Sequence, residues 1–211
     1  VKTKQLTKTA ISQTSIADAI TAEIPTARAE NTRFHIFRPN ISGEEHYAME
    51  IGKINRHQPT LARIHSACFT GDVLGSLKCD CGPQLQASLK QIQEEGCGAV
   101  VYLRQEGRGI GLHSKIQAYA LQDQGYDTLD ANLALGLPAD ARTYGIAARM
   151  LKDAGVNKVR MMTNNPLKVR GLEENGIKVE FRLPHMSGVS VQNIDYLRTK
   201  NERMGHMLDL E

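Results

Sequence analysis

The chain carries two hydrophobic patterns in succession, and the change between them falls near residue 80. Apolar and polar residues alternate over residues 33–37, 45–51 and 60–65, and the turn sequence Asn-Ile-Ser-Gly occupies residues 40–43 between the first two runs. Alternation with a period of two is typical of half-buried strands, and two such runs joined by a turn predict a β-hairpin. The first third of the chain is therefore predicted to be rich in β-structure.

Beyond residue 80 the apolar positions take the spacing of an α-helix. Leu85, Leu89 and Ile92 recur at intervals of four and three residues. Pro83 suits the first turn of this helix and Gly96 ends it. The same criteria predict helices from the glycine-rich loop to Gln124, over 143–154, from Pro166 to Glu174 and over 193–210, with strands over 99–103, 159–163 and 178–181. Strands alternating with helices predict an α/β (mixed α+β) fold, in which a β-rich N-terminal part precedes βαβ-type units around a mixed sheet.

Length and composition indicate one domain over residues 23–211, preceded by a polar segment over residues 1–22 that we interpret as an N-terminal arm or a short helix. The 41% hydrophobic and 23% charged residues are those of an ordinary globular protein, and no apolar run approaches the ~20 residues of a membrane helix. A net charge of +3 with few aromatic residues does not indicate nucleic-acid binding. The first twenty residues lack the apolar segment of a signal peptide, which favours a cytoplasmic protein with free thiols.

Three of the four cysteines, Cys68, Cys79 and Cys81, lie close together in the sequence, whereas Cys97 follows the predicted helix. A structural zinc site has four protein ligands, while a catalytic one has three and leaves the fourth position to water. The three-plus-one arrangement therefore predicts an open metal site. Alternatives stay open at this point, because three cysteines also suit burial as small apolar side chains, a disulfide with one thiol left over, or another redox role.

Three further motifs are typical of phosphate binding. The loop Arg-Gln-Glu-Gly-Arg-Gly-Ile-Gly at residues 104–111 places glycines and arginines directly after a predicted strand. Glycines let main-chain N–H groups approach an anion, and arginines bind phosphate oxygens through two hydrogen bonds. The motifs Thr-Asn-Asn-Pro-Leu-Lys at 163–168 and Pro-Ala-Asp-Ala-Arg at 138–142 suit either ligand binding or helix capping with solvated charges. Together these patterns predict a zinc enzyme that acts on a phosphorylated substrate.

Three histidines, His65, His113 and His206, are candidate metal ligands or bases. Their spacing does not demand either role. His65 lies three residues before Cys68, which is close enough for it to be a ligand or the partner of one. As part of an alternating strand, it is equally suited to face the core.

Taken together, these motifs closely resemble GTP cyclohydrolase II, the family that commits GTP to riboflavin synthesis. The family strings R-[VI]-H-S-E-C-x-T-G-D, C-D-C-G, R-Q-E-G-R-x-I-G-L, A-Y-x-L-Q-D-x-G-x-D-T, A-D-x-R and T-N-N-P-x-K correspond, in order, to residues 63–72, 79–82, 104–112, 118–128, 139–142 and 163–168. The resemblance extends over roughly residues 25–207. It implies a zinc-dependent hydrolase that opens the imidazole ring of GTP, releases formate and pyrophosphate and leaves a diaminopyrimidine nucleotide.

The resemblance also implies a role for each matched residue. The zinc ligands are expected at Cys68, Cys79 and Cys81, with a fourth, water ligand that attacks C8 of guanine and is assisted by Tyr119. Gln84 is similar to the family residue that recognises the guanine edge. Contacts to the ribose and triphosphate are expected from Arg63, Ile64, His65, Ser66, Ala67, Glu106, Gly107, Arg108, Thr128, Thr163 and Lys168, with Mg²⁺ on the phosphates. A cytoplasmic homodimer is expected as well.

Two points of the resemblance leave alternatives. The family pattern makes Arg142 a nucleophile at the α-phosphorus and Asp140 its base, whereas a guanidinium group, with a pKa above ~12, is better suited to clamp the α-phosphate. Ala67 stands where the family has glutamate. The rivals are therefore a related enzyme that stops at the formamidopyrimidine or uses another purine nucleotide, and a catalytically silent GTP-binding protein with structural zinc.

Overall fold

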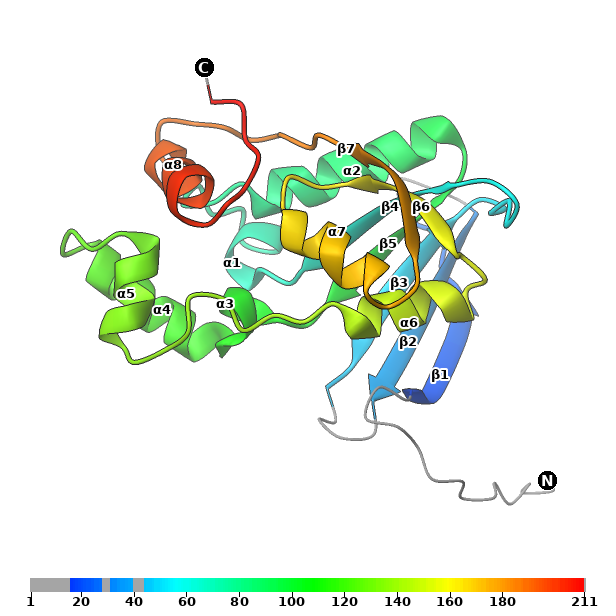
Figure 1. Ribbon diagram of the computed structural model, residues 1–211, viewed down its shortest axis with the longest axis horizontal. Coiled ribbons are helices and arrows are strands. Elements are labelled where there is room, and N and C mark those ends of the chain that lie inside the picture. Colours follow the sequence, from blue (N-terminus) through cyan, green and yellow to red (C-terminus); the bar gives the residue numbers. More distant parts are fainter. Residues whose placement is uncertain (1–15, 28–30, 40–43, 211) are drawn as a thin grey trace.

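The computed structural model of the protein describes residues 16–27, 31–39 and 44–210, and over these residues it forms one seven-stranded mixed sheet with helices on both faces (Figure 1). The strands are β1 (Ile16–Glu23), β2 (Thr32–Pro39), β3 (His46–Ile51), β4 (Thr60–Ser66), β5 (Gly98–Leu103), β6 (Lys158–Met162) and β7 (Lys178–Leu183). Their order in the sheet is β1-β2-β3-β5-β4-β6-β7. The predicted α/β class with a mixed sheet is confirmed.

The N-terminal half of the sheet is antiparallel. The predicted hairpin is confirmed, because β2 pairs antiparallel with β3 and Phe34 stands opposite Met49. Its turn at residues 40–43 lies outside the described residues. The predicted arm over residues 1–22 is wrong for residues 16–22, which form β1 and pair with β2. As an edge strand, β1 pairs on one side only, and its side chains from Ala19 to Glu23 are exposed.

Eight helices are found in the described part of the chain: α1 (Phe69–Asp72), α2 (Cys81–Glu95), α3 (Glu106–Gly109), α4 (Gly111–Gln122), α5 (Thr128–Ala134), α6 (Gly145–Asp153), α7 (Pro166–Glu173) and α8 (Ile194–Arg203). The predicted α2, α4, α6 and α7 are confirmed, whereas α1 and α5 were not predicted. The helical tail predicted to reach residue 210 is wrong beyond Arg203. Gly205 takes a left-handed φ of 65°, and the following Met207 donates its main-chain N–H to the carbonyl of Asn164 at 2.8 Å.

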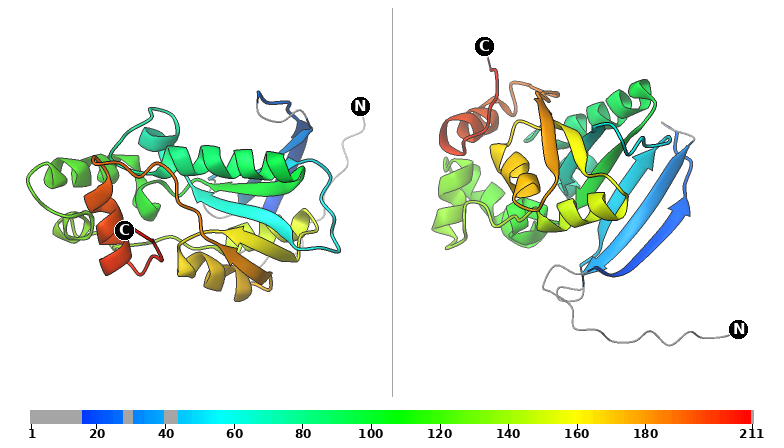
Figure 2. Two further views of the ribbon diagram at one scale, coloured as in Figure 1. Left: turned by 90° about the horizontal axis from the view of Figure 1, so that it is seen from above. Right: turned by 45° about the vertical axis from the view of Figure 1, so that its right-hand side comes forward.

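The sheet separates two hydrophobic cores. On one face α2 packs on the strands, with Ile92 buried against Leu61 and Val100. On the other face α6 and α7 cover a larger core that includes Ile64 and Val101 (Figure 2). Successive residues of β4 and β5 therefore serve opposite faces, and both faces are apolar because both are covered. No helix among the described residues combines the length and apolar character needed to cross a membrane.

The arrangement of the parallel strands positions the candidate site. β5, β4, β6 and β7 run parallel, so their carboxyl ends meet at one edge of the sheet. The predicted cysteine run follows β4, the arginine-glycine loop follows β5, and the Thr163–Lys168 motif follows β6. The last motif opens α7 as predicted, with the Asn165 side chain capping the N–H of Leu167 at 2.9 Å. In open α/β sheets this edge is where ligands bind.

His185, just after β7, ties this edge to α2. Its Nε2 lies 2.8 Å from the main-chain oxygen of Gln84 and therefore donates to it, while the main-chain N–H of His185 donates to Asn164 Oδ1 at 3.0 Å. Burial lowers the pKa of His185 to about 4. The folded protein thus keeps this imidazole neutral at pH values where the unfolded chain protonates it.

We expect the stability contributed by neutral His185 to be lost as the pH falls from about 6.5, the ordinary histidine pKa, towards about 4. When the pH is lowered from 7.5 to 5, the free energy of unfolding should fall in both proteins. The fall should be smaller in His185→Gln than in the parent protein by on the order of 2 kcal/mol. Urea unfolding at the two pH values measures this difference. His113→Gln, at an exposed histidine of α4, is the matched control. An identical pH dependence in all three proteins would contradict the prediction.

Candidate functional site

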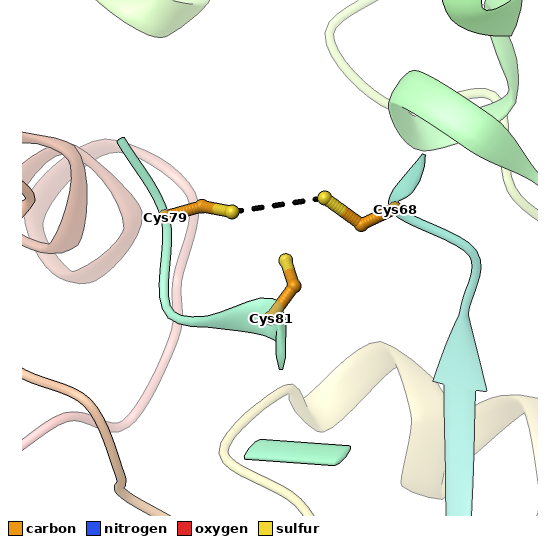
Figure 3. A group of neighbouring side chains, drawn as sticks. All are labelled: Cys68, Cys79 and Cys81. Atoms are coloured by element: carbon orange, nitrogen blue, oxygen red, sulfur yellow. Dashed lines mark hydrogen bonds between the residues drawn. The ribbon is translucent and has the colours of Figure 1, made fainter. Parts of the chain in front are cut away.

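The three clustered cysteines meet in space at the carboxyl edge of the sheet. Cys68 follows β4, and Cys79 and Cys81 stand at the start of α2, with the three Sγ atoms all within 4.8 Å of one another (Figure 3). The Sγ atoms of Cys68 and Cys79 are 3.6 Å apart. Cys97 is not part of this group. All four cysteines are free thiols, so the disulfide alternative is wrong.

The space around the cysteine trio (Cys68, Cys79 and Cys81) suits a metal ion. Two glycines allow its loops to approach, since a Cβ at Gly71 would lie 2.9 Å from Cys79 Sγ and one at Gly82 would lie 2.3 Å from the oxygen of Gly71. Three converging soft sulfur ligands match the donor set preferred by Zn²⁺. The residues therefore fit a metal with one open coordination position.

The thiols share their protons unequally. Hydrogen bonds from Cys79 and Cys81, with the charge of Lys115, lower the pKa of Cys68. Hydrogen bonding to Cys68 raises the pKa of Cys79 to about 11 and raises that of Cys81 well above its ordinary value. Without metal, one thiolate is thus stabilised by its two protonated neighbours. A bound cation requires all three as thiolates, so metal affinity must decrease as the pH falls.

The buried carboxylate of Asp72 fixes the base of the cysteine trio. It accepts hydrogen bonds from His65 Nε2 at 3.0 Å, from the main-chain N–H of Cys68 at 2.9 Å and from the hydroxyl of Tyr102 at 2.8 Å. The rings of His65 and Tyr102 also stack, with centroids 5.4 Å apart. His65 is therefore not a member of the sulfur cluster and is connected to it through Asp72, which accepts from the main chain of Cys68. Burial lowers its pKa despite the bond to Asp72.

Two adjoining cavities surround the cysteine trio. The first reaches from Cys81 to the start of α7, and the second from Cys68 to α4 and α5, and both are lined by Ser66, Cys81 and Arg108. Every residue to which the resemblance gives a role lines one of them except Ile64 and Asp140, and of the three candidate histidines His113 lines neither cavity. Ile64 is buried in the sheet and contributes only its carbonyl, which accepts from Lys168 Nζ at 2.8 Å. Asp140 is connected to the site through Arg142.

The first cavity is strongly cationic. The basic side chains along its wall belong to Arg63, Arg108, Arg142, Lys168 and Lys200, and Asp80 is the carboxylate among the lining residues. Several buried polar atoms of this wall have no hydrogen-bond partner among the described residues, namely Arg63 Nε, His65 Nδ1, Ser66 Oγ, Arg108 Nη2 and Asn165 Nδ2. All of these except the neutral histidine nitrogen are hydrogen-bond donors. The wall is therefore built to receive an acceptor-rich, anionic ligand.

The pair Asp140 and Arg142 forms a two-pronged ion pair. Arg142 donates from Nε to Oδ1 at 2.9 Å and from Nη2 to Oδ2 at 2.5 Å, and its main-chain N–H also donates to Oδ1. Burial lowers the pKa of Arg142, but its hydrogen bonds to Asp140 outweigh this effect and raise the pKa above its ordinary value. The guanidinium group therefore stays charged.

Several predicted ligand contacts are occupied by internal partners. The Gln84 amide accepts from Arg63 Nη2 and donates to Asp80 Oδ2, both at 2.5 Å. The Glu106 carboxylate accepts from the main-chain N–H of Phe69 at 2.6 Å and from Lys115 Nζ at 2.8 Å. Its negative charge is thus directed into the protein.

Sequence analysis missed three contributors to the site. Lys115 contacts the cysteine trio, and its spacing of four residues from Tyr119 on α4 was a usable signal. Lys200 of α8 lies 3.2 Å from Asp80 Oδ1, and no motif pointed to it. Tyr196 of α8 lines both cavities, with Arg108 5.6 Å and Lys200 5.0 Å from its ring centroid.

The fold and the site together define an α/β protein with a candidate three-thiolate metal centre beside an anion-binding cavity. The family model of GTP cyclohydrolase II matches residues 17–184, which is most of the chain and begins within β1. The chain therefore belongs to the GTP cyclohydrolase II family and is an enzyme of that type. The resemblance inferred from the motifs is confirmed.

Curated relatives agree with this assignment. A GTP cyclohydrolase-2 of Acinetobacter baumannii (strain SDF) is 53% identical over 188 residues, which cover 89% of this chain and 94% of the relative. A GTP cyclohydrolase-2 of Azospirillum brasilense is 51% identical, covering 88% of this chain and 48% of the relative. The riboflavin biosynthesis protein RibBA of Chlamydia trachomatis serovar D is 51% identical, covering 90% of this chain and 45% of the relative.

The three-plus-one arrangement of cysteines predicts a sharp difference between two similar substitutions. Cys81→Ser should lower the affinity for Zn²⁺ or Co²⁺ at least 100-fold, because it removes one of three thiolates. Cys97→Ser, at a cysteine outside the trio, should bind as the parent protein does. Titration of the metal-free proteins with Co²⁺, followed by the sulfur-to-cobalt absorption, measures both. Equal losses in the two variants would contradict the assignment of ligands.

Proposed function

We propose that the protein is a zinc-dependent hydrolase that opens the guanine imidazole ring of GTP and releases formate and pyrophosphate. The observation that carries the proposal is the adjacency of the cysteine trio to a wall of buried, unpartnered donors. A metal centre and a phosphate-binding wall in one site are what a hydrolase of a nucleoside triphosphate requires. The names of the relatives supply GTP as the substrate, and RibBA supplies riboflavin biosynthesis as the context.

The electrostatics of the first cavity support binding of the triphosphate. Burial lowers the pKa of Arg63 to about 10, and burial with the neighbouring charges of Arg63 and Arg142 lowers that of Lys168 well below its ordinary value. Cations so close together repel one another, so their arrangement is unfavourable until an anion arrives. A triphosphate would relieve this repulsion, and Mg²⁺ would neutralise the phosphate charge that the protein does not reach.

The position of Gln84 supports recognition of the guanine edge. Arg63 and Asp80 hold opposite ends of its amide, which fixes the oxygen and nitrogen in one orientation. One N–H and one lone pair remain free for a base. An amide held from both ends discriminates between purines better than a mobile one, because turning it would break two buried hydrogen bonds.

The second cavity supports the hydrolytic step. A Zn²⁺ ion bound to the trio would supply a Lewis acid that activates water next to the purine. Tyr119 lines the same cavity, and burial raises its pKa to about 12. It is therefore a neutral phenol that can hold or donate a proton near the opening ring. Ala67 lines this wall too, in the place of the family glutamate.

For Arg142 we favour the clamp over the nucleophile. The paired carboxylate of Asp140 keeps the guanidinium charged and fixes its plane. A charged guanidinium has no lone pair for attack on phosphorus but stabilises negative charge that develops there.

We also propose a cytoplasmic homodimer. Phe69, Val73 and Leu112 line a common surface hollow and are 44%, 67% and 38% exposed, which is typical of a surface covered by another chain.

Zinc-loaded protein with GTP and Mg²⁺ should release formate and pyrophosphate in equal amounts, and removal of the metal by a chelator should abolish formate release. Enzymatic assays of both products and mass spectrometry of the pyrimidine measure this. Release of pyrophosphate without formate would indicate the rival enzyme that stops at the formamidopyrimidine. The replacement of the family glutamate by Ala67 is the specific reason to consider that rival. Tight GTP binding without turnover would indicate the silent binder.

If Arg142 clamps the α-phosphate, Arg142→Lys should lower kcat about 100-fold or more, because lysine keeps the charge but cannot form two parallel hydrogen bonds. The clamp also predicts that acid-quenched turnover mixtures contain no guanylyl group on Arg142. Peptide mass spectrometry of the parent protein checks this directly. A phosphoramidate found at Arg142 would establish the nucleophile instead.

A further inference from the structure

Lys115 is a buried cation that the proposed reaction does not use. It projects from α4 to the cysteine trio, and its side chain is 10% exposed. The ammonium group lies 3.1 Å from Cys68 Sγ, 2.9 Å from Thr70 Oγ1 and 2.8 Å from Glu106 Oε1. An ammonium has three protons, and each one has an acceptor here. Although Lys115 lines the second cavity, it has no proton left for a substrate.

The contact with sulfur has a consequence for the metal. Three thiolates and one divalent cation carry a net charge of −1, and thiolates donate electron density strongly enough to weaken the metal as a Lewis acid. A cationic N–H donor on one sulfur draws density away from that ligand. Glu106 offsets part of the ammonium charge, but it also accepts from the main-chain N–H groups of Phe69 and Gly107. The donor geometry at Cys68 is therefore fixed.

We propose that Lys115 is a positioning residue that hydrogen-bonds the Cys68 thiolate of the loaded metal centre and thereby strengthens the metal as a Lewis acid. Thr70 and Glu106 fix the direction of the ammonium group, so the effect falls on Cys68. Cys79 and Cys81 lack such a cationic donor among the described hydrogen bonds. The inference rests on the proposed metal centre.

The chain offers a matched control for this role. Lys78 also lies over the Tyr119 ring, at 5.3 Å from the centroid compared with 5.6 Å for Lys115. Its side chain is 45% exposed and pairs with Asp123 at 2.5 Å rather than with sulfur. The two lysines thus lie at similar distances from the tyrosine ring and differ in their contact with the trio.

The test compares Lys115→Met, Lys115→Gln, Lys115→Arg and Lys78→Met in the full chain loaded with Co²⁺ and with Zn²⁺. In the Co²⁺ proteins, loss of the cationic donor should move the sulfur-to-cobalt absorption to lower energy in Lys115→Met and Lys115→Gln. In the Zn²⁺ proteins, kcat should fall roughly 10- to 100-fold with KM for GTP changed less than about threefold. Lys115→Arg should recover part of both effects, and Lys78→Met should match the parent.

Other outcomes overturn the inference in distinguishable ways. An unchanged absorption with a raised KM would make Lys115 a substrate contact. An unchanged absorption and kcat with a lower melting temperature would make it purely structural, and Gln serves here if Met does not fold. A parent protein that neither binds Co²⁺ nor turns over GTP would overturn the proposed function first and this inference with it. If the parent protein binds Co²⁺ and turns over GTP, a failure of the Lys115 variants to behave as expected would overturn only the role proposed for Lys115.

Discussion

The carboxylate of Asp72 is the contact on which the site depends. Its side chain is only 4% exposed, yet it is satisfied entirely by donors from three segments: His65 at the end of β4, Tyr102 in β5 and the main chain at Cys68. A buried carboxylate that loses one such donor is destabilised by about 1–3 kcal/mol or more. The two central strands and the first sulfur are therefore fixed relative to one another before a metal binds.

Next to the Asp72 contact, buried cations of the first cavity repel one another. Arg63 and Lys168 are buried together, and several of their neighbours have donors with no partner in the described structure. Such an arrangement lowers stability and is retained because a ligand can satisfy it, as is typical of functional sites. The ion pairs between Asp140 and Arg142 and between Asp80 and Lys200 limit the repulsion at the edge of the cavity.

Local pattern predicted the parts of the fold that local interactions determine. Pro83, the spacing of Leu85 and Leu89, and the left-handed Gly96 delimit α2 from sequence alone. α5 was not predicted because its short sequence carries no clear apolar period. The helix begins where the Asp127 side chain accepts from the main-chain N–H of Leu129 at 2.8 Å. The position of β4 between β5 and β6 in the sheet could not be predicted either, because it depends on pairing between strands far apart in the sequence.

The site divides in the same way. The cysteine trio was predictable because its ligands lie within one short stretch, and the resemblance then added the residues that share its motifs. Lys200 was not predictable, because its partner Asp80 is 120 residues away. A single sequence gives no sign that two such charges meet, and the family model that matches residues 17–184 ends before α8 begins.

That separation also sets an order in time. A ribosome makes the sulfur ligands and α2 long before it makes α8, and Lys200 emerges 120 residues after Asp80. Until then the cavity lacks the wall formed by α8. α8 is therefore the last helix of the site to be made, and its arrival completes the wall of the cavity.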